Sequence, residues 1–459
     1  MMSGSPLFSR KDISKILFPL VLQNILTITI GMVDSIMVSG DGEAAFAGVS
    51  LVSSLDTLLV TLFSSIASGG AVVLAQTMGR GDRKLSCEAA KQLLYVTFAI
   101  ATVISVCVLI PRTALLQLLF GDAEADVMRN ALGYFTIIAL SFPFLAVDNA
   151  VGAIFRAQGD SMISLKISLF KNALNISGNA ILIYGLHMGA IGAALATLIA
   201  RIIGAVVLIL IVHRKERYIY IEHLFTYRPS KDIVKAILHI GVPNGIENSL
   251  FQFGKVITSS LISTLSTASI AANAAALSLA NLQYTTGGAV QSTMISVVGK
   301  CVGAEEKEQA KRYAKILLAL GYLLIFIVSV LLAVFATPLL SLYNLSPEGL
   351  VTARELIWFH GAASIVLWAT AFCLPSVFRA ANDVRFTMVV SIFSMWAFRV
   401  ALAHILVPSS LTVLGYELTG AGMDIMGVWV AMTIDWVFRA ILFAWRFCSG
   451  RWLTKYKAL

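Results

Sequence analysis

A six-residue segment occurs twice in this chain, and the two copies lie almost half a chain length apart. The copies are 223 positions apart in a chain of 459 residues. They read Phe155-Arg156-Ala157-Gln158-Gly159-Asp160 and Phe378-Arg379-Ala380-Ala381-Asn382-Asp383. Other landmarks recur at nearly the same offset, among them Pro19 with Pro243 and Gly69-Gly70-Ala71-Val72 with Gly287-Gly288-Ala289-Val290. The fold must therefore be built from one unit used twice.

The composition indicates that lipid surrounds most of this unit. Hydrophobic residues make up 58% of the chain and charged residues only 13%, which is more apolar surface than a soluble fold of this length could bury. A membrane-spanning helix needs about 20 mainly apolar residues. Twelve stretches meet that length, six in each half: 13–37, 46–77, 92–111, 131–154, 163–184, 189–212, 237–262, 269–298, 313–336, 355–377, 386–407 and 425–447.

We therefore predict an all-α integral membrane protein with twelve transmembrane helices in two pseudo-symmetric six-helix bundles. The predicted boundaries are an amino-terminal lobe over residues 1–212, a cytoplasmic linker over 213–236 and a carboxy-terminal lobe over 237–459. The linker is long and polar, so we expect the lobes to move as bodies. Duplicated bundles are common among secondary transporters, which keep the substrate site between their repeats.

The net charge of +9 is best explained by membrane orientation. If the first helix starts in the cytoplasm, the outer loops contain only three basic residues, Arg112, Arg129 and Arg354. The opposite orientation would violate the positive-inside rule. We therefore expect a multi-pass protein of the plasma membrane with both termini cytoplasmic, and no nucleic-acid partner.

Motifs for other chemistry are missing from the sequence. It contains no GxxxxGK[ST] phosphate loop, HExxH, CxxC or GxSxG, so ATP-driven pumping, zinc hydrolysis and serine-ester chemistry have no support. Its five cysteines have no metal-site spacing. We predict that the protein is not an enzyme, has no catalytic residues, cofactor or structural metal, and uses an ion gradient as its driving force.

Charged residues inside the predicted spans must pair, reach the interface or line a wet cavity, because each costs about 3 kcal/mol in lipid. Asp435 and Arg439 are four residues apart, which suits an intrahelical ion pair, and Arg201 could extend toward the cytoplasmic interface. Asp34 and Glu247 have no basic residue one helical turn away. A carboxylate placed in this way can take up a proton or Na⁺ and release it, which is the chemistry of an antiporter.

Several further side chains could line a cavity for a cationic compound. Arg399 needs Asp435, Glu247 or backbone carbonyls as a partner, and Lys255 is too far around its helix from Glu247 to pair with it automatically. Aromatic and thioether groups offer a cation polarizable surfaces. The predicted cavity residues are Asp56, Lys255, Tyr284, Met294, Trp368 and Trp396.

Three motifs together resemble the multidrug and toxic compound extrusion (MATE) family, and the resemblance covers essentially the whole chain. They are Ala75-Gln76-Thr77-Met78-Gly79-Arg80-Gly81-Asp82, the repeated segment at 155–160, and Asn175-Ile176-Ser177-Gly178-Asn179 with the glycine- and alanine-rich stretch from Gly189 to Thr197. The resemblance implies two lobes around a central cavity. It also implies export of organic cations or other toxic compounds, including amphipathic ones, in exchange for H⁺ or Na⁺, and we expect a monomer to be functional.

Family site residues can be carried over only where this sequence matches. Asp34, Asn175, Asn179 and Thr197 match a cation site of the amino lobe, which makes Asp34 the candidate Na⁺ position, and Glu247 matches an acid of the seventh helix. Several family members have Asp where this chain has Asn179, and some have an acid where it has Trp368. The identity of the coupling ion therefore stays open between H⁺ and Na⁺.

Two other classes of function compete with this hypothesis. A flippase for a lipid-linked saccharide, from the same superfamily, would use Arg201, Lys255 and Arg399 to hold a pyrophosphate. A membrane transferase would need a carboxylate cluster with a metal or nucleophile near the surface. The scattered bases argue against the flippase, and the lack of a companion His or Asn at motif spacing argues against the transferase.

Overall fold

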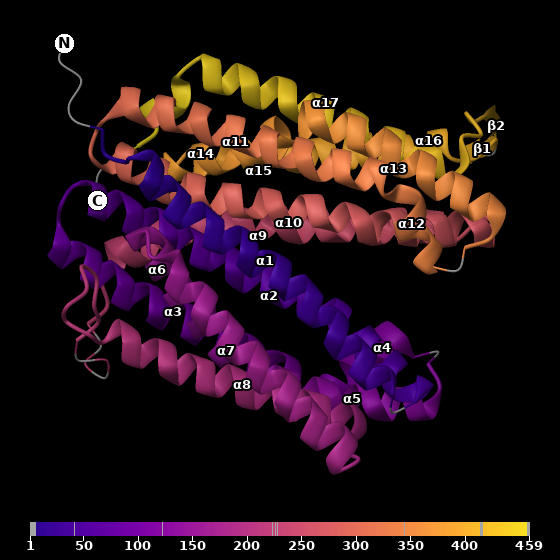
Figure 1. Cartoon of the computed structure of the whole chain (residues 1–459), viewed down its shortest axis with the longest axis horizontal. Coiled ribbons are helices and arrows are strands. Elements are labelled where there is room, and N and C mark those ends of the chain that lie inside the picture. The colour runs from indigo at the N-terminus through magenta and orange to yellow at the C-terminus, as the bar shows by residue number, and fades with distance from the viewer. Residues whose placement is uncertain are drawn as a thin grey trace. The chain divides into compact units, whose positions relative to one another are not determined.

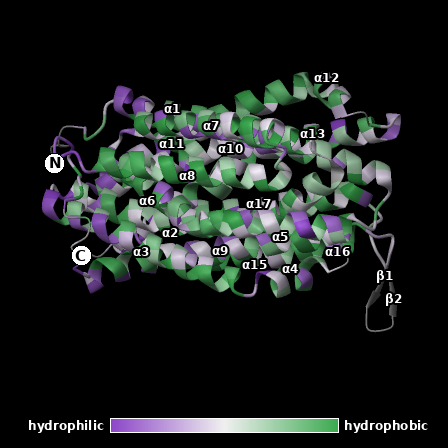
Figure 2. Ribbon diagram, turned by 90° about the horizontal axis from the view of Figure 1, so that it is seen from below, coloured by the Kyte–Doolittle hydropathy of each residue, from purple (hydrophilic) through white to green (hydrophobic). Residues whose placement is uncertain are grey.

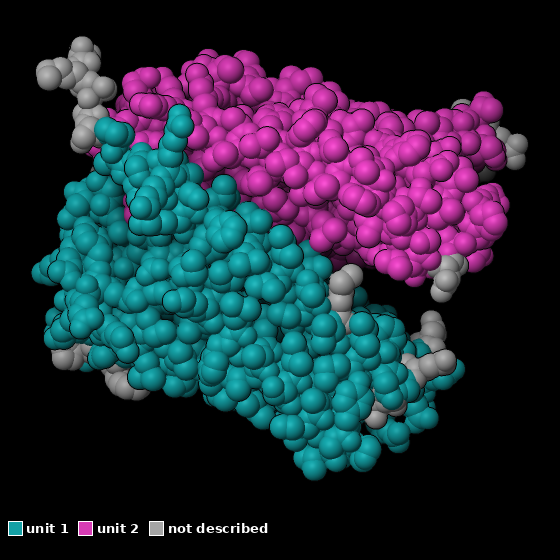
Figure 3. All heavy atoms as spheres, in the orientation of Figure 1, with its two compact units in different colours: residues 1–245, 459 teal, residues 246–458 magenta. Residues whose placement is uncertain are grey.

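A computed structural model describes residues 6–456, apart from 41, 122, 223, 225, 227, 344, 414 and 415. The chain divides into two compact units, residues 1–245 and residues 246–458, which Figure 3 distinguishes by colour. The first unit contains α1 (Arg10–Ser39), α2 (Glu43–Gly79), α3 (Arg83–Leu109), α4 (Arg112–Phe120), α5 (Ala125–Leu140), α6 (Phe142–Gln158), α7 (Ser161–Asn179), the π-helix η1 (Ala180–Gly185) and α8 (Gly189–Val212). The next helix, α9 (Lys231–Ile262), contains the boundary between the units.

The second unit continues with helices along almost all of its length (Figure 1). Its elements are α10 (Thr267–Gly303), α11 (Lys307–Val334), α12 (Ala336–Leu340), η2 (Ser341–Tyr343), α13 (Pro347–Trp368), η3 (Ala369–Cys373), α14 (Leu374–Ala380), α15 (Val384–Ser394), η4 (Met395–Val400), α16 (Ala401–Leu406), β1 (Ser410–Val413), β2 (Tyr416–Thr419), α17 (Asp424–Cys448) and η5 (Arg451–Thr454). The antiparallel hairpin of β1 and β2 is a small addition that the helical patterns do not predict.

Each of the twelve predicted spans falls on a helix or on a run of helical segments. Among the described residues, eight helices are long and apolar enough to cross a membrane, or nine if the bent pair α5 and α6 is one span. The predicted spans 163–184, 237–262 and 269–298 fall outside this set, so the count of twelve stays a prediction. The helices are largely hydrophobic along their lengths (Figure 2), and large apolar side chains such as Ile110 and Leu118 are 78% and 83% exposed. This protein is built for a lipid environment.

The bend between α5 and α6 has a local cause. The two helices meet at an angle of 46° around Ser141. Pro143 has no backbone N–H, so it cannot donate to the carbonyl of Ala139 four residues earlier. The Ser105 hydroxyl, from α3, donates to that carbonyl at 2.6 Å instead. The Ala139 carbonyl therefore keeps a hydrogen-bond donor at the bend. Ser141 lies at the corner between the two helices.

The repeated six-residue segments form the same turn in both units. Gly159 and Asn382 both have left-handed backbone conformations, with φ of 87° and 67°. In each copy the next residue, Asp160 or Asp383, donates its backbone N–H to the carbonyl of the phenylalanine five residues earlier, at 2.9 Å in both cases. Glycine and asparagine are the residues that adopt this conformation most readily at a helix end.

The aspartate of each turn forms an ion pair with an arginine that follows much later in the same unit. Arg217 donates to Asp160 at 3.1 Å, and Arg446, from α17, donates to Asp383 at 2.8 Å. The Arg446 pair is buried, with side chains 11% and 6% exposed, whereas the Asp160 side chain is 41% exposed. The repeated segment thus ends one helix and ties it to the last part of its own unit.

The predicted linker, residues 213–236, is shorter and more tightly held than its composition suggests. Helix α9 already begins at Lys231. Before it, the loop packs along α3, where Arg83 donates to the Tyr218 carbonyl at 3.0 Å and Gln92 donates to the Arg228 carbonyl at 2.6 Å. Lys91 donates to the Thr226 carbonyl at 2.7 Å. The loop is therefore bound to α3 of the first unit. That the two lobes move as bodies stays a prediction.

The close approach of Trp368 to α10 gives a test of packing in the second unit. A Cβ atom added at Gly287 would lie 1.9 Å from the Trp368 ring, which is itself stacked on Tyr284 and Phe372. We expect Gly287→Ala to destabilise the protein by about 1–3 kcal/mol, the usual cost of overpacking. Thermal unfolding in detergent would measure the loss. Gly31→Ala is the control, because no atom lies within 4 Å of its added Cβ, and an equal effect of both variants would contradict the prediction.

Candidate ion-binding site

The predicted site of the first unit is assembled around Asp34. This half-buried carboxylate lies on α1, and the buried Asn179, the last residue of α7, donates to its Oδ1 at 2.8 Å. Asn179 is 1% exposed, and its side-chain oxygen has no hydrogen-bond partner in the part of the chain that the structure describes. The π-helix η1 begins at the next residue, and such segments often occur at functional sites because they change the direction of neighbouring side chains.

Asn175 connects Asp34 to α8. One terminal atom of its amide lies 2.8 Å from Asp34 Oδ1 and 3.0 Å from Oδ2, and the other lies 3.1 Å from the Thr197 hydroxyl. We assign the first atom as nitrogen, which donates to the carboxylate, and the second as oxygen, which accepts from Thr197. The opposite assignment would place two acceptors against each other, which requires a proton or a cation between them. The sequence thus predicted a group of four residues that the fold brings together.

The pairing of Asp34 distinguishes it from the other acids of the first unit. Its partners are two neutral amides, and it forms no ion pair with a described basic residue. Amides solvate a carboxylate without cancelling its charge. A monovalent cation or a proton could therefore neutralise Asp34 in place.

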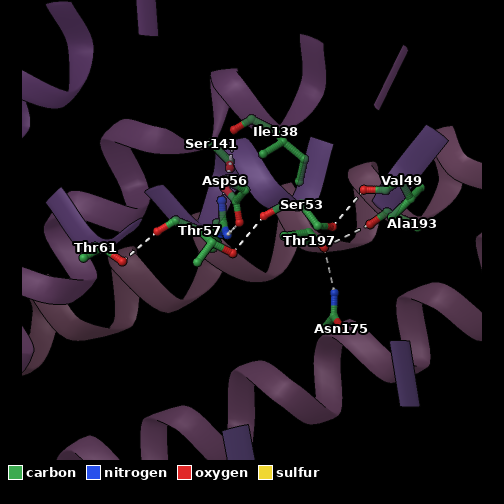
Figure 4. A network of polar contacts seen from close by, with 11 residues as sticks. Val49, Ser53, Asp56, Thr57, Thr61, Ile138, Ser141, Asn175, Ala193 and Thr197 are labelled. Carbon is green, nitrogen blue, oxygen red and sulfur yellow. Dashed lines mark hydrogen bonds and ion pairs between the residues drawn. The ribbon is translucent and has the colours of Figure 1, made fainter. Parts of the chain in front are cut away.

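Asp56, predicted as a cavity residue, lies in a polar network that Figure 4 draws together with Asn175 and Thr197. Arg201 donates to Asp56 Oδ2 at 3.5 Å and to the Ser141 hydroxyl at 2.6 Å, at the corner between α5 and α6. Both side chains of the pair are mostly buried, 17% and 24% exposed. The sequence suggested that Arg201 could extend toward the cytoplasmic interface, whereas in the structure its guanidinium pairs with a carboxylate from α2.

Asp148 pairs with a residue that sequence reasoning missed. Lys171, from α7, donates to Asp148 Oδ2 at 2.6 Å, and the two side chains are 19% and 26% exposed. Lys171 falls inside the predicted span 163–184, so its position within an apolar stretch was the available signal. The pair explains why Asp148 is not a free carboxylate of the candidate site.

Glu247 lies on the part of α9 that belongs to the second unit. It is 8% exposed, and its Oε2 atom has no hydrogen-bond partner among the described residues. No ion pair of Glu247 is found in the described part of the chain. An unpaired buried carboxylate is costly unless it binds a proton or a cation, so its chemistry fits the predicted role.

Two of the aromatic residues predicted for the cavity, Tyr284 and Trp368, belong to an interior cluster of the second unit. Tyr284 shares a hydrogen bond of 2.9 Å with His360 Nε2, and its ring stacks on Trp368 at 6.0 Å. Trp368 is 3% exposed and Met294 is fully buried, whereas Trp396 is half-buried in η4. Their assignment to a substrate cavity stays a prediction.

The buried pair expected within α17 is confirmed. Arg439 donates from Nε to Asp435 Oδ1 at 2.7 Å, with side chains 3% and 0% exposed. Arg399, from η4, instead donates to the Met432 thioether at 3.0 Å and forms no ion pair with a described carboxylate. Of the partners expected for Arg399, Asp435 is occupied by Arg439.

Comparison with known proteins decides the family. The MatE family model matches this chain twice, over residues 19–181 and 243–405, which repeats the spacing of Pro19 and Pro243. The chain belongs to the MATE family. The MATE model thus covers more than half of the sequence and follows its internal duplication, and this family membership makes the protein a multi-pass membrane transporter.

Individual MATE relatives match over nearly their whole length. An uncharacterized transporter, YisQ of Bacillus subtilis (strain 168), is 26% identical over 448 residues, covering 95% of this chain and 94% of the relative. A probable multidrug resistance protein, NorM of Thermotoga maritima, is 24% identical over 450 residues, covering 96% and 93%. An outward-facing structure of a multidrug resistance MATE transporter has a TM-score of 0.88 at 20% identity, covering 99% and 98%. The MATE fold is therefore shared along the chain.

A double-mutant cycle can test whether Asp56 serves structure. We expect Asp56→Asn and Arg201→Gln each to lower the free energy of unfolding, and the double variant to lose less than their sum, with a coupling of about 1–3 kcal/mol. The exposed pair Asp126 and Arg129, with side chains 70% and 79% exposed, is the control and should show about 0–1 kcal/mol. A coupling at Asp56 no larger than the control would contradict the structural assignment.

Proposed function

We propose that this protein exports organic cations and other toxic, amphipathic compounds in exchange for H⁺ or Na⁺. The observation that carries the proposal is the environment of Asp34, a carboxylate that accepts from two amides and has no basic partner among the described residues. Two other mostly buried acids of the first unit, Asp56 and Asp148, are held by Arg201 and Lys171. Asp34 is therefore the acid whose charge a coupling ion can neutralise, either as a bound proton or as Na⁺ held by oxygen ligands.

The proposed mechanism is alternating access. Binding of the ion at Asp34 from the outer side favours one arrangement of the lobes and weakens drug binding, and drug from the inner side displaces the ion. Glu247 is proposed as a second ion-binding acid, because it is buried and its Oε2 atom has no hydrogen-bond partner among the described residues. The two sites can differ in affinity, since Asp34 has amide donors and Glu247 has none among the described residues.

The multidrug names of the relatives support a broad choice of small-molecule substrates. We further propose a plasma-membrane location with both termini cytoplasmic, from the scarcity of basic residues in the outer loops, and a single chain as the functional unit. The flippase alternative has less support, because Arg201 is already paired with Asp56 and is not available to hold a pyrophosphate.

Substitution of the two acids tests the proposal directly. In proteoliposomes with separately imposed H⁺ and Na⁺ gradients, we expect Asp34→Asn to reduce gradient-driven transport of the cation rhodamine 123 by at least about tenfold, since the loss of an ion's charge partner costs more than 1.4 kcal/mol. Glu247→Gln should reduce it as well. The gradient that drives the wild type identifies the ion.

The control for this experiment is Asp126→Asn, which removes an acid that is 70% exposed at the surface. It should transport at the wild-type rate. If Asp34→Asn and Glu247→Gln both did the same while remaining folded in detergent, the assignment of the ion site would be wrong.

A further inference from the structure

Three cations of the second unit surround a single phenyl ring. The Lys255 ammonium lies 5.3 Å from the centre of the Phe251 ring, and the guanidinium carbons of Arg399 and Arg439 lie 5.3 Å and 5.4 Å from it. Cations this close repel one another, and contact with one ring compensates only part of that cost. The cluster therefore needs negative charge.

The chain itself supplies one carboxylate to this group. Asp435 accepts from Arg439 at 2.7 Å, so this cation is neutralised. Arg399 is 8% exposed, donates to the Met432 thioether, and has an Nε–H without a partner. A thioether is a weak acceptor and carries no charge. Among the described residues, Lys255 and Arg399 have no ion-pair partner.

The two unpaired cations differ in their access to a ligand. Lys255 is exposed on α9, whereas Arg399 is buried in the π-helix η4. Phe251 is half-buried, and its ring also lies 6.5 Å from Phe372. A ligand that reaches Lys255 would therefore lie near both basic and aromatic side chains.

The internal repeat relates this basic group to positions near Asp34, where the charge is negative. At the offset that separates Pro19 from Pro243, Asp34 corresponds to Thr258 and Gly31 to Lys255. At the offset of the repeated turn, Arg399 corresponds to Ile176, which is adjacent to Asn175. Equivalent helices thus present a carboxylate with amides in the first unit and two free cations in the second.

We propose that Lys255 and Arg399 form a binding site for organic anions in which a carboxylate or similar oxyanion is joined to an aromatic body. The anion would accept from the Lys255 ammonium and from the free Nε–H of Arg399, and its apolar part would pack on the Phe251 side of the site. This inference rests on the proposed transport function and adds anionic compounds to its substrates. The negatively charged group could equally belong to a lipid headgroup, and the experiment distinguishes the two sources.

Two dyes of similar shape and opposite charge can test the site. Fluorescein is anionic and rhodamine 123 cationic, and both contain a xanthene ring. Their binding to full-length protein in phosphatidylcholine nanodiscs would be measured by fluorescence anisotropy. We expect Lys255→Gln and Arg399→Gln to weaken fluorescein binding about tenfold or more, the usual effect of losing a charge-assisted hydrogen bond, and to weaken rhodamine 123 binding by a clearly smaller factor or not at all.

The controls separate a specific site from a general loss of charge or fold. Arg354→Gln removes a cation that also lies over an aromatic ring, 5.1 Å from Trp358, and should leave fluorescein binding unchanged. Lys255→Arg should retain binding. Because Lys255 is exposed, its variants should fold even if Arg399→Gln does not. The proposal would be overturned if the wild type did not bind fluorescein. It would also be overturned if the variants lost affinity equally for both dyes, or if Arg354→Gln lost as much fluorescein binding as they do.

A second arm adds phosphatidylglycerol to the nanodiscs. Competition with fluorescein in the wild type would support the site and assign it to lipid headgroups, whereas no competition would support a soluble organic anion. The binding measurement does not depend on transport. If the wild type showed no gradient-driven transport while Lys255→Gln lost fluorescein binding, only the proposed antiport function would fail.

Discussion

A charged side chain within a helix that crosses a bilayer needs a partner, because hydrocarbon offers none. Most buried charges of this protein meet that constraint inside their own unit. Asp56 pairs with Arg201, Asp148 with Lys171, and Asp435 with Arg439. These pairs join α2 to α8 and α6 to α7, and one lies within α17, so they help to fix how the helices of each unit pack. The buried acids and bases that form no such ion pair are the groups on which function can depend.

The exceptions are not alike. Asp34 has partners that stabilise its charge but do not cancel it, whereas Glu247 has a buried oxygen with no partner among the described residues. An amide-lined carboxylate is prepared for exchange between a bare and an ion-bound state, since its neighbours remain hydrogen-bonded in both. Neutral partners thus allow reversible binding where a lysine or arginine would occupy the acid permanently.

The sequence predicted the family, the helices and the group of four residues that includes Asp34, because each depends on local pattern or on motifs that survive in one chain. It did not predict which charge pairs with which. Arg201 was expected to extend toward the cytoplasmic interface, yet it donates to Asp56 and to the Ser141 hydroxyl. Lys171 was missed altogether. Such pairings depend on how helices distant in sequence are turned toward each other, which hydropathy does not record.

The two halves share their local backbone turns but differ in the side chains that several helices bring together. The turn at Gly159 and at Asn382 needs only a residue that tolerates positive φ and a backbone hydrogen bond across a few residues, so either sequence can form it. A binding site needs side chains from several helices, and one substitution changes its charge. Gly31 and Lys255 occupy equivalent positions on equivalent helices, and Lys255 alone adds a cation there. A duplicated scaffold can therefore hold a site for positive ions in one lobe and a basic site in the other without any change of fold.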